Sequence, residues 1–466
     1  MKYKLFEKEP LFYKNVFTLA LPIALQSLIT IGVNMLDTIM VGSLSEEALS
    51  ATSLANSFIS IYQIFCMGLG MGASVLVSRY YGMKMSNEET DKASHALKQT
   101  VCLMLRLTLL LAALFAGATA LIPRTIMRMY TEEEPIIELG MQYFRWSIVT
   151  YFFLGTSLTT TIALRSVRQV KLPLFVSIGA FFVNLGANYA FIFGEFGAPR
   201  MEVAGAAIGT LIARIFEAAC ILGYLFLKDS EIMFRVKDLF MKTESLLGEY
   251  IKICIPVLIS DGILAIGNNM VAVIIGHLGK TMVAANAITA VTQQLSTVVV
   301  QGVSQAGAIV TGQTLGTGDR EGTMKQGYLF FGLGLGLGLV SAAFIAIAKN
   351  PIISYYTGVG PETQRTAGSL MLAISLIIIF QATNSIMTKG VLRGGGDTKM
   401  LMITDNIFLW VISIPLGLLA GFVFKLPAFW IYVCLKSDQI IKTFWSFMRL
   451  KSGKWIKKIT TGKAGA

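Results

Sequence analysis

Two similar stretches of 24 residues decide the fold: LPIALQSLITIGVNMLDTIMVGSL (21–44) and IPVLISDGILAIGNNMVAVIIGHL (255–278). A helix needs about 20 residues to cross a hydrocarbon core about 30 Å thick. Each stretch is predominantly apolar and longer than this. They align without a gap at an offset of 234 residues, which places Pro22 on Pro256 and Asn34 on Asn268. We therefore expect membrane-spanning helices and an internal duplication.

The duplication extends beyond these two stretches. The same offset continues to Gly82, which falls on Gly316. A second similarity, at an offset of 228 residues, pairs Leu164-Arg165 with Leu392-Arg393. Because an even number of spans separates the copies, the halves should have the same orientation, related by an axis along the membrane normal.

Composition indicates the same class of protein. Of the 466 residues, 54% are hydrophobic and 14% charged, whereas about 25% of the residues of a soluble domain are charged. This excludes a soluble enzyme, a disordered chain and a nucleic-acid-binding protein. The 5 cysteines and 2 histidines form no spaced metal or disulfide motif, so we expect no cofactor.

Apolar segments predict an all-α integral membrane protein with twelve spans. Their limits are 16–41, 48–78, 95–122, 138–163, 172–194, 203–227, 251–277, 283–313, 325–348, 366–390, 400–424 and 427–448. The termini and even-numbered connections carry 27 of the 39 Lys and Arg residues, and the odd-numbered connections carry 7. The positive-inside rule then predicts a multi-pass protein of the cell (inner) membrane with both termini in the cytoplasm.

The repeat predicts two pseudo-symmetric six-helix lobes. Residues 1–230 form the N-terminal lobe, and residues 231–466 contain a cytoplasmic linker to about 250, the C-terminal lobe and a basic tail. Two such halves favour a transporter with alternating access over a purely structural bundle.

Asp37 is the strongest candidate for a functional residue. Together with Ser27, Thr30 and Asn34 it forms one helical stripe. A carboxylate at membrane depth is costly unless it is paired or hydrated, and such acids usually mark ion pathways. The alternative is a structural hydrogen bond to a neighbouring helix.

Polar stripes also occur on other spans of the first half. Asn184 and Asn188 share a face of the fifth span, and Thr210, Arg214 and Glu217 share a face of the sixth. The Arg214–Glu217 combination favours a structural ion pair. Thr210 and the two asparagines could join Asp37 in an oxygen-lined ion site, with a proton or a sodium ion on Asp37.

The second half supplies candidates for a substrate cleft. Deep polar positions there are Asp261, Asn268, Gln301, Gln381 and Asn384, with Thr30 added from the first half. Asp405 opens the eleventh span, where an interfacial position is expected. In the twelfth span, Asp438 and Lys442 are four residues apart and should pair. The glycine-rich segment 333–339 (LGLGLGL) indicates close helix packing, since no strand precedes it and it lacks lysine.

Several motifs resemble the multidrug and toxic compound extrusion (MATE) transporters, in particular their prokaryotic DinF-like branch. They are NMLDT (34–38) followed by VG (41–42), GAAIGT (205–210), LRGGGDTK (392–399), and the loops with Gly82 and Gly316. There are departures. Asn188 stands where several relatives carry an aspartate, Leu264 stands where a glutamate is expected, and the loop LRSVRQVKLP (164–173) lacks the usual glycines.

The resemblance implies the MATE/MOP-type fold and no enzymatic activity. It implies export of amphipathic, mostly cationic drugs or metabolites in exchange for protons or sodium ions, by a monomer in the lipid bilayer. Asp37 stands at the position of the coupling aspartate, and Asn184 and Thr210 match family positions. A flippase for lipid-linked oligosaccharides or lipids, from the same broad superfamily, is the alternative function.

Overall fold

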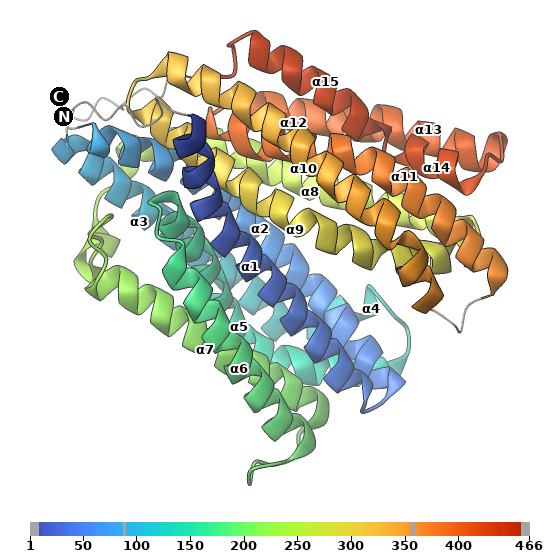
Figure 1. Cartoon of the computed structure of the whole chain (residues 1–466). Coiled ribbons are helices and arrows are strands. Elements are labelled where there is room, and N and C mark those ends of the chain that lie inside the picture. Colours follow the sequence, from blue (N-terminus) through green and yellow to red (C-terminus); the bar gives the residue numbers. More distant parts are fainter. Residues whose placement is uncertain (1–8, 87–89, 356–359, 458–466) are drawn as a thin grey trace. The chain divides into compact units, whose positions relative to one another are not determined.

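The computed structural model describes residues 9–86, 90–355 and 360–457, and all regular elements in these ranges are helical (Figure 1). Those of the first half are α1 (Glu9–Gly42), α2 (Glu46–Met85), α3 (Thr90–Leu121), α4 (Pro123–Arg128), α5 (Glu134–Ser166), α6 (Lys171–Phe193) and α7 (Glu202–Leu227). The 3₁₀ helix η1 (Val236–Phe240) lies in the linker.

The second half continues in the same way. Its first helices are α8 (Glu244–His277), α9 (Lys280–Gly316), α10 (Arg320–Tyr355) and α11 (Pro361–Ser385). The π-helical segments η2 (Ile386–Leu392), η3 (Phe408–Ser413) and η4 (Leu419–Val423) alternate with α12 (Thr398–Ile407) and α13 (Ile414–Leu418). The last helices are α14 (Ala428–Leu435) and α15 (Ser437–Lys451).

These helices confirm the predicted number of spans. Within the described ranges, eleven helical segments are long and apolar enough to cross a membrane. α14 and α15, which are separated only at Lys436, complete the twelfth. Most helices extend beyond the predicted spans, because helix geometry continues through the polar interface where the apolar run has already ended.

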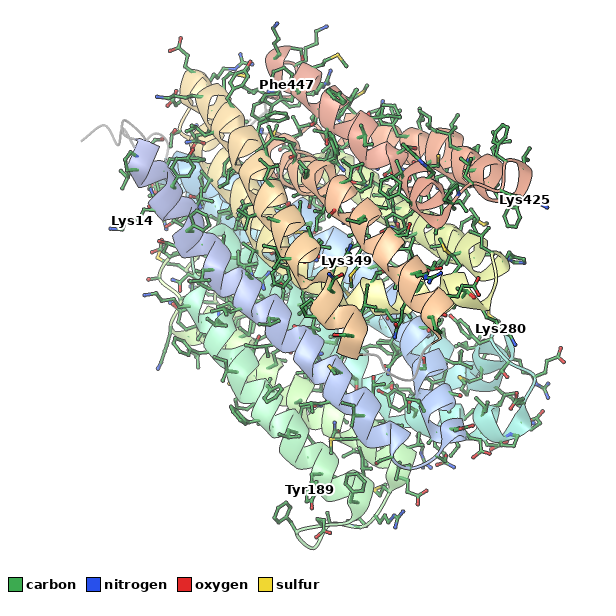
Figure 2. The ribbon with its side chains drawn as sticks, turned by 45° about the vertical axis from the view of Figure 1, so that its right-hand side comes forward. Lys14, Tyr189, Lys280, Lys349, Lys425 and Phe447 are labelled. Atoms are coloured by element: carbon green, nitrogen blue, oxygen red, sulfur yellow. The ribbon has the colours of Figure 1, made fainter. Side chains whose placement is uncertain are left out.

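The outward surface has the apolar character that a lipid environment requires. Leu114, Phe182, Val340 and Phe444 are each more than 60% exposed. Figure 2 shows Lys280 and Lys425 at one end of the helices from the second half, with Phe447 towards the other. Charged residues at the ends and apolar residues between them are typical of spanning helices.

The described residues form two compact units. The N-terminal unit comprises residues 25–84 and 90–254, and the C-terminal unit comprises residues 9–24, 85–86 and 255–457 without 356–359. The boundaries between the units fall inside α1, after Ala24, and inside α8, after Cys254. Both lie two residues or fewer from the aligned prolines Pro22 and Pro256.

Each unit has its own core. In the N-terminal unit α7 packs against α5 and α6, and in the C-terminal unit α11 packs against α9 and α10. The close packing predicted for LGLGLGL is confirmed, because a Cβ at Gly334 or Gly338 would collide with the α11 backbone at Thr383 or Ile379.

The repeated Leu-Arg motif occupies equivalent places in the two units. Arg165 donates to Gln26 on α1 of the N-terminal unit. Arg393 donates to both carboxylate oxygens of Asp261 on α8 of the C-terminal unit, at 3.0 and 3.3 Å. In both halves, the arginine at the end of the fourth span (α5 in the first half, α11 with η2 in the second) thus binds the first span of its half, α1 or α8.

Candidate functional site: a polar cavity in the N-terminal unit

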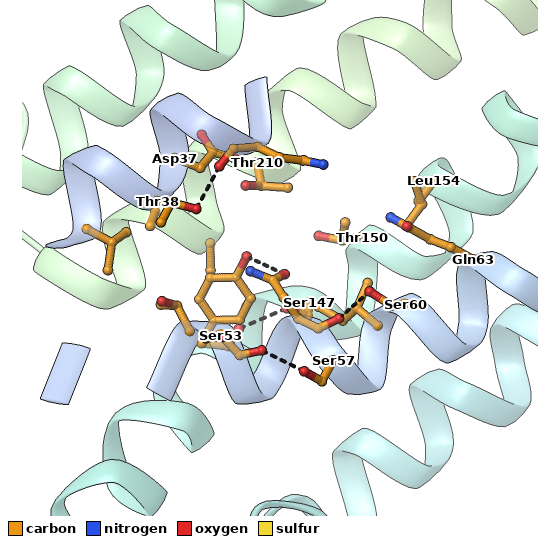
Figure 3. Close-up of a pocket in the computed structure, with 18 of the residues that line it drawn as sticks. Asp37, Thr38, Ser53, Ser57, Ser60, Gln63, Ser147, Thr150, Leu154 and Thr210 are labelled. Carbon is orange, nitrogen blue, oxygen red and sulfur yellow. Dashed lines mark hydrogen bonds between the residues drawn. The ribbon is translucent and has the colours of Figure 1, made fainter. Parts of the chain in front are cut away.

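A cavity of about 660 Å³ lies inside the N-terminal unit (Figure 3). Its wall comes from α1, α2, α5 and α7, and most of the side chains that face it are polar. The polar residues are Thr30, Asn34, Asp37, Thr38, Ser50, Thr52, Ser53, Asn56, Ser57, Ser60, Gln63, Tyr143, Ser147, Thr150, Thr210 and Arg214.

Asp37 lies in this wall, on α1, and is held by an amide from α6. Asn188 donates from Nδ2 to Asp37 Oδ1 at 2.6 Å and also lies 3.3 Å from Asn184 Oδ1. Both asparagines are buried, at 1% and 4% exposure. This short hydrogen bond from a buried amide holds the Asp37 side chain in one orientation at membrane depth.

Gly209 on α7 makes room for this contact. A Cβ at Gly209 would overlap the Oδ1 atom of Asn188 and crowd its backbone nitrogen. Gly209, the second glycine of the GAAIGT segment, therefore permits the close approach of α6 and α7. This approach places the Asn188 side chain beside Asp37.

Thr210 and Arg214 contribute the α7 side of the cavity. The predicted pair is confirmed, since Arg214 NH1 lies 2.6 Å from Glu217 Oε2. Glu217 is buried at 8% exposure, so the guanidinium is anchored by its own helix.

The oxygen ligands of this cavity suit a small cation. Asp37 supplies one carboxylate, and amide and hydroxyl groups line the same cavity. A single carboxylate is neutralised equally well by a proton or by a sodium ion. No group of three His, Cys, Asp or Glu residues that could hold a metal occurs among the residues the structure describes, so a site for a multivalent ion would need other ligands.

The α2 side of the cavity was not predicted from the sequence. Ser53, Asn56, Ser57, Ser60 and Gln63 all face it. Their spacings of three, one, three and three residues are those of one helical face, so the signal was present. It was overlooked because serines within an apolar run seldom stand out individually.

The candidates from the second half belong to the C-terminal unit and do not line this cavity. Asp261 forms an ion pair with Arg393, whose side chain is only 5% exposed. Asn268 accepts from Lys436 at 3.2 Å. Gln381 accepts from Gln293 and Asn384 donates to Gln439, at 3.0 and 2.8 Å, while Gln301 is exposed.

Asp405, for which an interfacial position was expected, is buried within the protein. It is 4% exposed and lies 3.3 Å from Lys442 Nζ. The predicted Asp438–Lys442 pair is confirmed at 3.0 Å. A carboxylate near the start of a span can be buried because the lysine from another span compensates its charge.

Twelve spans, together with a polar cavity in the N-terminal unit that holds one oriented acid, are typical of a polytopic membrane transporter. Comparison with known proteins gives the family. The MatE family model matches residues 22–190 and 256–419, two segments that begin at the prolines aligned by the repeat. Because these segments cover more than half of the chain, the protein belongs to the MatE family, which is one of transporters and not of enzymes.

Individual relatives match almost the whole chain. The probable multidrug resistance protein NorM of Thermotoga maritima is 27% identical over 473 aligned positions, covering 98% of this chain and 97% of the relative. The uncharacterized transporter YisQ of Bacillus subtilis is 22% identical, with 95% of each chain covered.

Solved structures show the same fold. A crystal structure of MATE in complex with MaL6 has a TM-score of 0.84 and 18% identity, and the match covers 97% of this chain and 99% of that one. A MOP superfamily transporter from Pyrococcus furiosus has a TM-score of 0.83 and 19% identity, covering 97% and 98%.

Proposed function

We propose that the protein is a secondary active exporter of amphipathic, mostly cationic compounds, coupled to entry of protons or sodium ions through Asp37. The observation that carries this proposal is the position of Asp37. It is the only carboxylate in the wall of the described cavity, and a buried amide orients it. The names of the NorM relatives support drug export.

Coupling follows from competition for one charge. An organic cation and the coupling ion both bind favourably near an ionised Asp37, and binding of one makes the other less favourable. Reversing a 1:99 population of two conformations takes about 5.5 kcal/mol of differential binding. Neutralising a carboxylate at membrane depth offers free energy on this scale.

The remaining assignments belong to the same proposal. Asn188 and Asn184 orient the acid, and Thr210 and Asn34 supply oxygen atoms nearby. The protein acts as a monomer in the inner membrane. The 27 to 7 distribution of basic residues supports a cytoplasmic position for both termini. Placement in the DinF-like branch stays a prediction.

Proteoliposomes loaded with a fluorescent organic cation test the proposal. Efflux is measured under a pH gradient and, separately, under a sodium gradient, for the natural protein, Asp37→Asn and Glu46→Gln. Glu46 is an exposed acid at the start of α2, outside the cavity. We expect one gradient to drive efflux, which Asp37→Asn abolishes and Glu46→Gln retains.

Other outcomes would contradict specific parts of the proposal. Full efflux by Asp37→Asn would remove Asp37 from the coupling mechanism. Efflux that neither gradient drives would contradict antiport and would favour the flippase alternative.

A further inference from the structure

Most hydroxyl groups in the cavity wall already use their protons. Ser57 donates to the carbonyl of Ser53 at 3.0 Å, and Ser60 donates to the carbonyl of Asn56 at 2.8 Å (Figure 3). A hydroxyl has one proton and two acceptor lone pairs. Each of these serines can therefore accept from a ligand without loss, whereas donating to a ligand would break an existing bond.

The same pattern recurs on the other helices around the cavity. On α1, Thr30 and Thr38 donate to carbonyls four residues earlier, at 3.0 and 2.7 Å. On α5, Ser147 and Thr150 do so at 3.0 and 3.3 Å. Three of the four walls thus present hydroxyl oxygens as acceptors.

Asp37 increases this bias, because an ionised carboxylate only accepts. Arg214, the only cation in the wall, directs NH1 to Glu217 at 2.6 Å. Besides the other N–H groups of Arg214, the donors are mainly the amides of Asn34, Asn56 and Gln63. The wall also carries the acceptor oxygens of these amides, of Asp37 and of the hydroxyls.

The large aliphatic residues in the wall, Val41, Leu49, Ile59 and Leu154, give the cavity apolar surface beside its oxygens. A cation without N–H groups would displace water from the oxygens without replacing its hydrogen bonds. Sites built to hydrogen-bond a ligand discriminate strongly against analogues that lack the matching groups.

We propose that the cavity selects organic cations that carry several N–H donors, such as primary amines, amidines and guanidines, over cations of equal charge that lack them. This inference rests on the proposed function, since it assumes that the exported cation enters this cavity. It adds a chemical criterion that charge and amphipathicity alone do not provide.

Proflavine and acridine orange are a matched pair of probes. Both contain a protonated acridine ring of single positive charge. Proflavine carries two primary amino groups, and acridine orange carries two dimethylamino groups in the same positions. We would measure the Kd of the purified full-length protein for each dye by fluorescence anisotropy, and gradient-driven efflux of each from proteoliposomes.

We expect proflavine to bind about tenfold more tightly or better, and to be exported preferentially. The variant Ser57→Ala/Ser60→Ala removes two acceptors and should weaken proflavine binding several-fold, with little effect on acridine orange. Ser375→Ala is the matched control, because Ser375 also donates to its own helix but lies on α11, outside the cavity.

The outcomes separate the two proposals. Gradient-driven export of both dyes with equal affinity would overturn the selectivity and leave the exporter intact. Export of neither dye would overturn both. Equal weakening of both dyes by the double variant would show that the serines act through packing and would also overturn the inference.

Discussion

Asn188 on α6 donates a 2.6 Å hydrogen bond to the carboxylate of Asp37 on α1. This contact joins the acid that we propose to couple transport to a helix 151 residues further along the chain. The orientation of Asp37 therefore depends on the packing of α6 and α7 as well as on its own helix.

Replacing Asn188 by alanine should reduce coupled efflux about tenfold or more at equal protein content. A hydrogen bond to a charged group contributes about 1.5–3 kcal/mol, and its loss leaves Asp37 without its oriented partner. Asn34→Ala is the comparison, since Asn34 lines the cavity but is exposed. Equal effects of the two substitutions would mean that the Asn188–Asp37 bond has no special role.

Gly209→Val should lower both stability and transport. The new side chain would push Asn188 away from Asp37, and overpacking of this kind costs about 1–3 kcal/mol. Gly223→Ala on the same helix is the control, because a Cβ there meets no atom within 4 Å. Thermal unfolding in detergent and proteoliposome efflux are the measurements, and an unchanged Gly209→Val protein would refute the packing argument.

Arg393→Gln should destabilise the C-terminal unit. It breaks the ion pair with Asp261 and leaves a carboxylate that is 23% exposed without its partner. Breaking a buried pair costs about 3–5 kcal/mol, and partial exposure of Asp261 places the expected loss at the lower end. The double variant Arg393→Met/Asp261→Met should recover part of the loss, and thermal unfolding of this variant and of the single variants Arg393→Met and Asp261→Met measures the coupling. Additive losses would contradict a direct pair.

Lys442→Met should be more damaging than Lys425→Met. Lys442 lies within 3.3 Å of both Asp405 and Asp438, so its removal leaves two buried acids without their shared cation. Lys425 is exposed beyond the end of η4. Asp405→Asn in the Lys442→Met background should restore part of the thermal stability, because one of the two negative charges is then removed. No difference between the two lysine variants would count against the buried triad.

The linker should lose protection in acid. Burial acts to raise the pKa of Asp238, but the backbone N–H of Arg235 and the Lys98 ammonium, 3.2 Å away, outweigh it and lower that pKa. An acid with a lowered folded pKa stabilises fully above its unfolded pKa, about 3.9, and this contribution is lost as the pH falls through the folded value.

Hydrogen exchange of the η1 segment provides the measurement. Near neutral pH the natural protein should be better protected than Asp238→Asn, and the difference should shrink as the pH falls below about 4. A difference that does not depend on pH would show that Asp238 acts only through its shape and hydrogen bonding.

The sequence alone determined the spans, the repeat and the leading acid. Apolar runs of membrane length must form helices, since backbone polar groups have no other partners in lipid. Asp37 stood out for the same reason, because an acid in such a run requires an explanation. The i,i+4 pair of Asp438 and Lys442 was also predictable, because helix geometry fixes neighbours within one element.

Tertiary structure decided what those helices bring together. Arg393 reaches Asp261 from 132 residues away, and Lys442 neutralises Asp405 from a different span. The polar face of α2 became a cavity wall only through its position opposite α1 and α5. Periodicity identifies a helix face, but what that face contacts depends on packing between distant segments, which no local pattern encodes.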